Sequence, residues 1–314
     1  MAERTTRSGS RAQSRKRGGP EGTAGPRAAP VTRPERLVVS KPPPEPDYPR
    51  YRVEPGTRLR LADVDPDESE RYRRKRDVAE ELDRQRARIA GLQARLYAEH
   101  GRSLLIVLQA MDTGGKDGTI KGVFRGVNPQ GCQVASFKAP SDEELDHDFL
   151  WRVHNRTPAK GMIQIFNRSH YEDVLIARVK QLVPEAVWQR RYQIINQFEQ
   201  ALTAEGTTVL KFMLHISKDE QKRRLESRLA DPDKRWKFML GDLKERALWD
   251  DYQRAYEDAV NQCSTPYCPW YVVPANKKWY RNLVVARTIA DTLEAMDPRY
   301  PPAEPGLDKV EIPD

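Results

Sequence analysis

The sequence predicts an α/β fold in which a parallel β-sheet carries helices on both faces. Apolar strand-like runs alternate with helical patterns throughout residues 102–296, as expected of parallel strands joined by crossover helices. The run Leu104–Leu108 is short, apolar and partly β-branched, which is typical of a fully buried strand. Directly after it, Gly114-Gly115-Lys116 predicts a tight turn that leads into a helix.

The turn after this strand has the layout of a phosphate-binding loop. Backbone N–H groups and the N-terminus of the following helix attract an anion, and Lys116 adds a positive charge. The match to G-x-x-x-x-G-K-[ST] is incomplete, because Ala110 replaces the first glycine and Asp117 replaces the metal-binding Ser or Thr. Asp112 adds a carboxylate inside the loop, which suits a metal ion that bridges phosphates. A glycine-rich turn without a ligand is the alternative.

The other elements follow from periodicity and capping signals. Four further strands are predicted at 132–137, 161–166, 207–216 and 270–273, and long helices at 69–99, 188–202, about 242–262 and 277–295. The apolar seam of the 69–99 helix fits either a coiled-coil dimer or a helix lying on the body. A capping box at Ser141–Glu144 predicts a helix that reaches about Val153.

Basic residues cluster after the fourth predicted strand. A capped helix begins at Ser217 and carries Arg223 and Arg228, and a basic connection leads to the next helix. Nucleotide kinases carry their lid at this place, so we predict a helical lid over about 217–262 that closes on phosphates. The alternative is a solvated charged face, which is what most charge runs are.

Asn167 and Arg168 follow the third predicted strand, at the edge of the sheet where ligands of such folds bind. We interpret Arg168 as a phosphate-binding residue, with a surface salt bridge as the alternative. Many phosphate-loop proteins have a magnesium-binding Asp where this chain has Asn167. For His170, a hydrogen-bonded position at a helix start is favoured over catalysis.

Residues 1–50 predict a disordered basic arm rich in Pro, Arg and Gly. Nine Arg or Lys and three Glu in residues 1–40 supply +6 of the net charge of +8, and ten of the 24 prolines precede residue 56. The rest of the chain is nearly neutral, so the charge gives little support for a nucleic-acid-binding fold. An electrostatic tether to a polyanion is the sharper alternative for the arm.

Several absences indicate a cytoplasmic protein. No apolar run approaches the roughly 20 residues of a transmembrane helix, and the N-terminus has no apolar signal region. The odd count of three cysteines suits a reducing compartment, and Cys263 and Cys268 are interpreted as structural.

Several motifs in order resemble the polyphosphate kinase 2 family over about residues 75–296. The segment Gln109–Ile120 is similar to its Walker-A-like motif and Phe166–Asp173 to its Walker-B-like motif. The neutral Asn167 and the block Leu145–Trp151 resemble the class III group. The remaining similar segments are Asn128–Cys132, Phe137–Ser141, Glu144–Arg152 and the lid module Ser217–Lys237.

This resemblance implies a P-loop kinase-like fold that moves phosphoryl groups reversibly between inorganic polyphosphate and AMP or ADP, with Mg²⁺. The expected partners are polyphosphate and the adenine nucleotides AMP, ADP and ATP. No association with a membrane is expected, and the chain is expected to form a homo-oligomer. The expected organisation begins with the arm at 1–50. An extension with a long helix follows at 51–100, then the phosphotransferase domain at 101–298 and a C-terminal tail at 299–314.

The resemblance also implies roles for single residues. Asp112, Lys116 and Arg168 are the expected catalytic residues, and Asp112 and Asp117 the expected metal ligands. Phosphate or nucleotide binding is expected of Gly114, Gly115, Asp117, Gly118, Thr119, Lys121, Asn167, Arg178, Arg223 and Arg228. The rival readings are an ATP-dependent nucleoside monophosphate kinase on the same fold and a non-enzymatic polyanion-binding protein that works through the arm.

Removal of residues 1–50 gives the first prediction. A shortened chain that begins at Tyr51 should unfold cooperatively and keep its turnover number, because the arm lies outside the predicted fold. Its affinity for long polyphosphate should fall most at low salt, where charge attraction is least screened. Chemical unfolding and steady-state kinetics at two salt concentrations test this, and loss of cooperative unfolding would contradict it.

Overall fold

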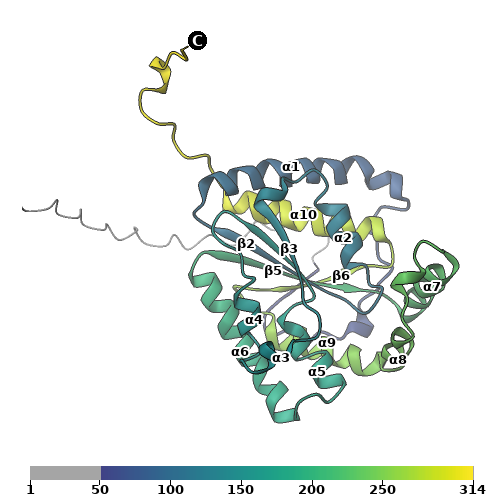
Figure 1. Ribbon diagram of the computed structural model, residues 1–314. Helices are drawn as coiled ribbons and strands as arrows, with labels where there is room; N and C mark the ends of the chain where they lie inside the picture. Colours follow the sequence, from purple (N-terminus) through teal and green to yellow (C-terminus); the bar gives the residue numbers. More distant parts are fainter. Residues whose placement is uncertain (1–50, 314) are drawn as a thin grey trace, which may run out of the picture. The chain divides into compact units, whose positions relative to one another are not determined.

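The computed structural model describes residues 51–313, and these belong to one compact unit of the chain. The predicted arm at 1–50 lies outside the described residues. Within them, a central sheet carries helices on both faces (Figure 1). This arrangement confirms the predicted α/β class.

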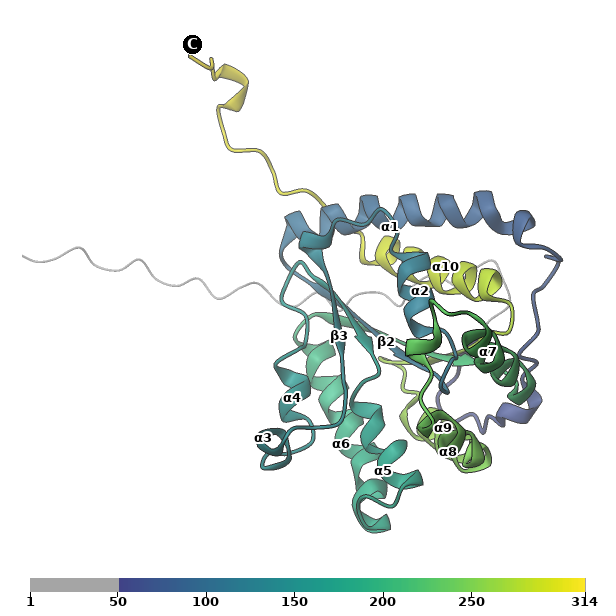
Figure 2. The ribbon, with the colours of Figure 1, turned by 45° about the vertical axis from the view of Figure 1, so that its right-hand side comes forward.

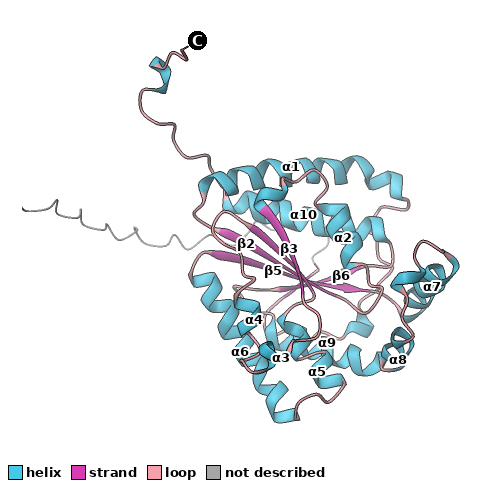
Figure 3. Cartoon of the chain, viewed as in Figure 1, coloured by secondary structure: helices cyan, strands magenta, loops and turns pink. Residues whose placement is uncertain are grey.

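Six strands form the sheet in the order β1-β6-β5-β2-β4-β3. Figure 3 shows the sheet in magenta between cyan helices. Five of them are parallel to one another, and all five were predicted. The sixth, β1, pairs antiparallel with β6, so the sheet is not purely parallel; two residues are too few to show a periodic pattern. The strands are β1 (Arg52–Val53), β2 (Ser103–Gln109), β3 (Cys132–Ser136), β4 (Ile163–Asn167), β5 (Thr207–His215) and β6 (Trp270–Pro274).

Strand β2 lies at the centre of the parallel part, between β4 and β5. All seven of its residues are buried, which explains its nearly continuous apolar sequence. In chain order the parallel strands lie as 2-3-1-4-5, so the carboxyl ends of all five open on one edge of the sheet. The segments that leave these ends build the candidate site, as is usual in open parallel sheets.

Two layers of helices cover the sheet (Figure 2). One face is covered by α1 (Ala79–Glu99), α2 (Lys116–Val123) and α10 (Lys278–Met296). The other is covered by α4 (Trp151–His154), α5 (Ile176–Val179), α6 (Glu185–Ala204) and α9 (Trp249–Cys263). Short α3 (Asp142–Leu145) precedes α4, and α7 (Lys218–Ala230) and α8 (Gly241–Ala247) follow β5. Single-turn 3₁₀ helices include η2 (Lys75–Val78), η4 (His170–Asp173) and η5 (Arg235–Lys237).

The apolar seam of α1 packs on α10, with Leu82, Ile89 and Leu96 buried. This contact decides between the two roles left open for the helix: it lies on the body. The prediction of a start at residue 69 was wrong, since α1 begins at Ala79 after the 3₁₀ turn η2.

Two predicted helices are interrupted. The capping box at Ser141 and Glu144 is present, but the helix that it opens ends at Leu145. Asp148 Oδ1 accepts the Leu150 N–H at 2.9 Å, and this local bond starts a new turn before α4. The helix expected over 242–262 is divided at Leu248 into α8 and α9.

No helix within residues 51–313 is long and apolar enough to cross a membrane. The three cysteines have free thiols, and Cys263 and Cys268 are fully buried. Burial raises the pKa of both thiols to about 12, so they are packed as small apolar groups. Their structural interpretation is confirmed.

A buried polar network lies behind the turn that carries Arg168. Lys211 Nζ donates to Glu199 Oε2 at 2.5 Å, to the Tyr171 hydroxyl at 2.9 Å and to the Cys263 carbonyl at 2.7 Å. His170 Nε2 lies 3.2 Å from Glu199 Oε1, which confirms it as a hydrogen-bonded residue at the start of η4. Burial alone would raise the pKa of Glu199, but Lys211 and His170 hold it below its ordinary value.

The Lys211–Glu199 pair predicts an asymmetric effect on stability. Lys211→Met should lower the free energy of unfolding by about 3–5 kcal/mol, because it leaves a buried carboxylate without its cation. The double variant Lys211→Met/Glu199→Gln removes both charges and should recover most of that loss. Urea unfolding of the three proteins measures the difference, and equal losses in the single and double variants would disprove the argument.

Candidate active site

The loop between β2 and α2 requires glycine at two positions, for different reasons. A Cβ atom on Gly114 would lie 2.4 Å from the Ala110 Cβ and 2.8 Å from the Met111 carbonyl oxygen. Gly115 is the N-cap of α2 and has φ of 102°, a left-handed conformation that other residues rarely adopt. The glycine turn predicted from the sequence is therefore confirmed, with steric crowding at one residue and backbone conformation at the next.

Lys116 is the first residue of α2, and its side chain folds back over the loop. Its Nζ donates to the Ala110 carbonyl oxygen at 3.1 Å. Burial and the nearby Arg168 lower the pKa of Lys116, whereas Asp112 acts in the opposite direction. The ammonium thus lies among the charged groups of the loop and of the segment after β4.

Asp112 and Arg168 come together from different strands. Arg168 Nη2 donates to Asp112 Oδ1 at 3.2 Å. Arg168 has φ of 63° and Thr113 has φ of 64°, so non-glycine residues in the left-handed region occur on both sides of this contact. Such strained residues concentrate at functional sites.

Asn167 meets the other carboxylate of the loop. Its Nδ2 donates to Asp117 Oδ1 at 2.7 Å, and Asp117 lies exposed in the first turn of α2. An Asp in place of Asn167 would set two like charges at this distance. The neutral carboxamide therefore fits its partner in this chain.

The two loop carboxylates fit a magnesium ion by the chemistry of their donors. Mg²⁺ prefers oxygen ligands and is usually held by one or two carboxylates together with substrate phosphates. Within residues 51–313, no group of three or more His, Cys, Asp or Glu side chains could hold a metal ion. Asp112 and Asp117 thus suit a site that substrate phosphates complete, and not a cage made by the protein alone.

Sequence reasoning missed Glu172, which lies on η4, four residues after Arg168. Desolvation raises the pKa of this carboxyl, while Arg168, Lys116 and Gln109 oppose the shift. The only local signal at Glu172 is its spacing of three residues from Ser169, which is typical of a capping box, but the Ser169 hydroxyl accepts the Tyr171 N–H at 3.1 Å. Only the fold shows that it faces the two cations of the site.

The sequence also missed two residues of the predicted lid that contact the loop. Gln221 Nε2 donates to the Asp112 carbonyl oxygen at 3.1 Å, and Arg224 Nη1 donates to the carbonyl oxygens of Thr113 and Gly114 at 3.0 Å each. Both lie on the same helix as Arg223 and Arg228, which the sequence favoured, and Arg224 directly follows the exposed Arg223. Burial against the loop, and not charge clustering, distinguishes them.

Of the other predicted binding residues, three arginines lie apart from the loop, and the rest lie on α2 directly after it. Arg178 pairs with Asp258 at 2.6 Å and stacks on Trp188, between α5, α6 and α9. Arg223 is exposed and pairs with Glu220, while Arg228 donates to the Lys237 carbonyl oxygen at 3.4 Å. Lys121 is exposed in the last turn of α2, Gly118 lies on the first turns of that helix, and Thr119 Oγ1 donates to the Gly115 carbonyl oxygen.

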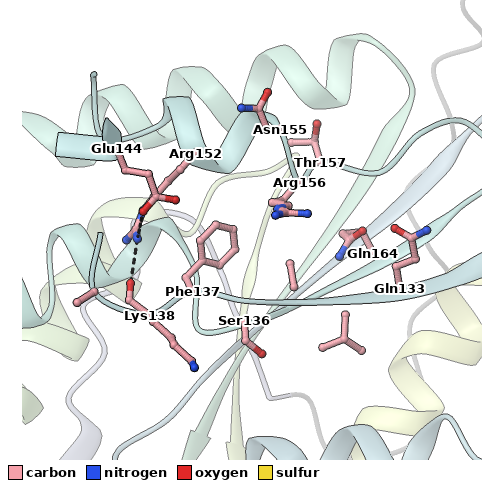
Figure 4. A pocket seen from close by; sticks show the side chains of 13 residues that line it. Gln133, Ser136, Phe137, Lys138, Glu144, Arg152, Asn155, Arg156, Thr157 and Gln164 are labelled. Atoms are coloured by element: carbon pink, nitrogen blue, oxygen red, sulfur yellow. Dashed lines mark hydrogen bonds and ion pairs between the residues drawn. The ribbon is translucent and has the colours of Figure 1, made fainter. Parts of the chain in front are cut away.

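A separate cavity of about 450 Å³ opens along β3 (Figure 4). Arg152, Arg156, Lys138 and Glu144 line it, together with amide and hydroxyl side chains. Arg152 already donates to the Lys138 carbonyl oxygen and pairs with Glu144. None of the predicted site residues lines this cavity, so it is distinct from the loop.

A glycine loop with a lysine, an arginine at the adjacent strand end and carboxylates between them define a P-loop phosphotransferase. Residues 72–301 match the family model described as Polyphosphate kinase 2 (PPK2). The chain belongs to the polyphosphate kinase 2 family and is a kinase.

Similar proteins agree with this assignment. The chain is 54% identical over 264 residues to the AMP/ADP-polyphosphate phosphotransferase of Meiothermus ruber, covering 84% of this chain and 99% of the relative. It is 43% identical to the ADP-polyphosphate phosphotransferase of Rhodopseudomonas palustris, covering 83% and 94%. The crystal structure of Polyphosphate Kinase 2 from Arthrobacter aurescens TC1 superposes with a TM-score of 0.79 at 49% identity, covering 82% and 92%.

The raised pKa of Glu172 gives a prediction on pH dependence. A carboxyl whose pKa is raised gains its proton at a higher pH than an ordinary glutamate, and its charge then no longer balances Lys116 and Arg168. The wild type should therefore lose kcat/KM as the pH falls through this raised pKa, and Glu172→Gln should lack that acidic limb. Profiles of kcat/KM from pH 4 to 9 test this, and an unchanged acidic limb in Glu172→Gln would refute it.

Proposed function

We propose that this kinase transfers the terminal phosphoryl group of inorganic polyphosphate to AMP and ADP, in a reversible reaction that requires Mg²⁺. The observation that carries the proposal is the Asp112–Arg168 contact beside Lys116, at the carboxyl edge of the sheet. The names of the two relatives above support polyphosphate as donor and AMP and ADP as acceptors.

The proposed mechanism relies on positioning and charge neutralisation. Phosphoryl transfer requires an in-line arrangement of donor and acceptor and neutralisation of phosphate charge, more than covalent chemistry by the protein. The amides at the start of α2 and Lys116 bind the transferring phosphoryl group, and Arg168 binds the acceptor phosphate across from Asp112. Asp112 would be the principal ligand for Mg²⁺ and Asp117 a secondary one, and the ion would supply neutralisation of phosphate charge.

The remaining predicted residues are proposed to act farther from the reacting atoms. Lys121, Arg223 and Arg228 form a basic path for the rest of the polyphosphate chain, and Arg178 serves the nucleotide. The pKa of Asp242 on α8 is consistent with a lid that approaches the loop. Burial raises this pKa, and the negative charge of the loop residue Asp112 raises it further. ATP as product and reverse donor, a homo-oligomeric state, a cytoplasmic location and the class III assignment belong to the same proposal.

The decisive experiment omits ATP. Purified protein is mixed with Mg²⁺, polyphosphate and AMP, and ADP and ATP are measured by chromatography; both should form. Lys116→Met serves as the control for contaminating kinases, because it removes the loop cation. Product that forms only when ATP is the donor would favour an ordinary nucleoside monophosphate kinase, and no product with any nucleotide would reject the proposal.

The two loop carboxylates should differ in importance. Asp112→Asn should lower turnover by roughly 10²–10³-fold, the usual effect of removing one preorganised electrostatic group. Asp117→Asn should be milder, because Asp117 also favours the dipole of α2 and pairs with Asn167. The two variants are compared by measuring turnover and polyphosphate binding across a magnesium titration. Wild-type turnover in Asp112→Asn would show that the metal role belongs elsewhere.

A further inference from the structure

Two buried arginines contact the carbonyl side of the phosphate loop. Arg224 of α7 is 7% exposed and Arg281 of α10 is 1% exposed. Arg224 Nη1 lies 3.0 Å from the carbonyl oxygen of Gly114, and Arg281 Nη1 lies 3.4 Å from the same atom. Arg224 Nη2 also donates to the carbonyl oxygen of Ala275, at 2.6 Å, beyond the end of β6. The loop is thus held by two helices that follow it by more than a hundred residues in the sequence.

These contacts fix the direction of successive peptide groups. The carbonyls of Asp112, Thr113 and Gly114 all accept from α7 or α10 side chains. In a planar trans peptide the C=O and N–H groups point in opposite directions. The Thr113 N–H therefore points away from Gln221, and the Gly115 N–H points away from the two arginines. The Gly114 N–H donates to the Met111 carbonyl oxygen at 2.9 Å. Outward-facing amides of this kind are what a phosphate requires.

Arg281 also explains why Gly115 has no side chain. A Cβ atom on Gly115 would lie 2.0 Å from Arg281 Nη1, and one on Gly118 would lie 3.4 Å from Nη2. The guanidinium therefore packs directly against the loop and the first turn of α2. Glycine at 115 is needed for this approach as well as for its positive φ.

The charge of Arg281 is balanced only in part. Arg224 has a carboxylate partner, with its Nε 2.7 Å from Glu220 Oε1. Within the described part of the chain, no ion pair joins Arg281 to a carboxylate; its guanidinium donates to Asn282 Oδ1 and to the Gly114 carbonyl oxygen. Burial and the neighbouring Arg224 lower the pKa of Arg281 to about 9, so it stays charged at neutral pH. A buried, unpaired cation is unfavourable unless an anion binds nearby.

We propose that Arg224 and Arg281 are positioning residues for phosphoryl transfer, which orient the loop amides toward the phosphates and whose buried charge is balanced when those phosphates bind. This role for the arginines shares one assumption with the proposed function, namely that the loop binds phosphate. It does not depend on whether the donor is polyphosphate or ATP. Neither arginine contacts the phosphate itself; both act through the backbone of residues 113–115.

Substitutions at Arg281 test this idea against a purely structural role. Binding of tripolyphosphate and of ATP, each with Mg²⁺, is measured by calorimetry, together with the melting temperature without ligand. Arg281→Met should weaken the binding of both ligands by about tenfold or more, the range expected when a charged hydrogen bond is lost. Arg281→Lys keeps the charge but not the planar fork, so its loss should be intermediate.

Arg287 provides the matched control on the same helix. It is 7% exposed and pairs with Glu81 and the Tyr72 hydroxyl, away from the loop. Arg287→Lys should lower the melting temperature yet leave both dissociation constants within about twofold of wild type, because distant sites act independently. If the Arg281 variants also lower only the melting temperature, the positioning role is refuted.

The two ligands separate this proposal from the proposed function. A wild-type protein that binds ATP but not tripolyphosphate would contradict the polyphosphate donor, while the Arg281 variants would still test the loop with ATP. If Arg281→Met did not fold, Arg281→Lys alone would decide: unchanged binding of both ligands overturns the inference, and a selective loss of binding supports it.

Discussion

The structure depends on how a buried strand ends. Strand β2 is enclosed on both faces, so the chain can turn toward solvent only at its carboxyl end, and Gly114 and Gly115 make that turn. The turn leaves Asp112 and Lys116 on either side of the two glycines, at the edge where the neighbouring strands also end. The charged residues that the candidate site gathers from β4 and from the lid are therefore arranged around one glycine turn.

Charged groups are paired in two places around this turn, one beside the loop and one in the buried layer behind it. Close to the loop, Asp112 accepts from Arg168 and Asp117 accepts from Asn167, so each carboxylate has a donor at or just after the end of β4. Behind the segment after β4, Lys211 and Glu199 are completely buried and bond to His170 and Tyr171, which directly follow the Arg168–Ser169 pair. A fully buried network of this kind is rigid, and it gives Arg168 a fixed support despite the positive φ of that residue.

Helix α7, which belongs to the predicted lid, has one face against the loop and another toward solvent. Gln221 and Arg224 are buried against the loop carbonyls, whereas Arg223 is exposed to solvent. In addition, Arg246 of α8 donates to the Lys218 carbonyl oxygen and to Gln221, so the base of the lid is tied to its second helix. If the predicted lid closes, the movement is expected in the connection between α7 and α8, where Trp236 and Leu240 are exposed.

The sequence by itself determined the class of fold, the five parallel strands and the loop, because burial of β2 and the backbone of a glycine turn leave local signatures. It also predicted that Asp112, Lys116, Asn167 and Arg168 lie at one edge of the sheet, since the ends of parallel strands meet there. Only the tertiary structure decided which arginines contact the loop. Arg223 and Arg224 are neighbours of the same type, and Arg281 lies far along the chain. Burial against the loop at Gly115 distinguishes Arg224 and Arg281 from Arg223, and no local sequence pattern encodes it. Burial and long-range contacts likewise set the environment of Glu172, because a pKa depends on groups that folding brings together and not on sequence neighbours.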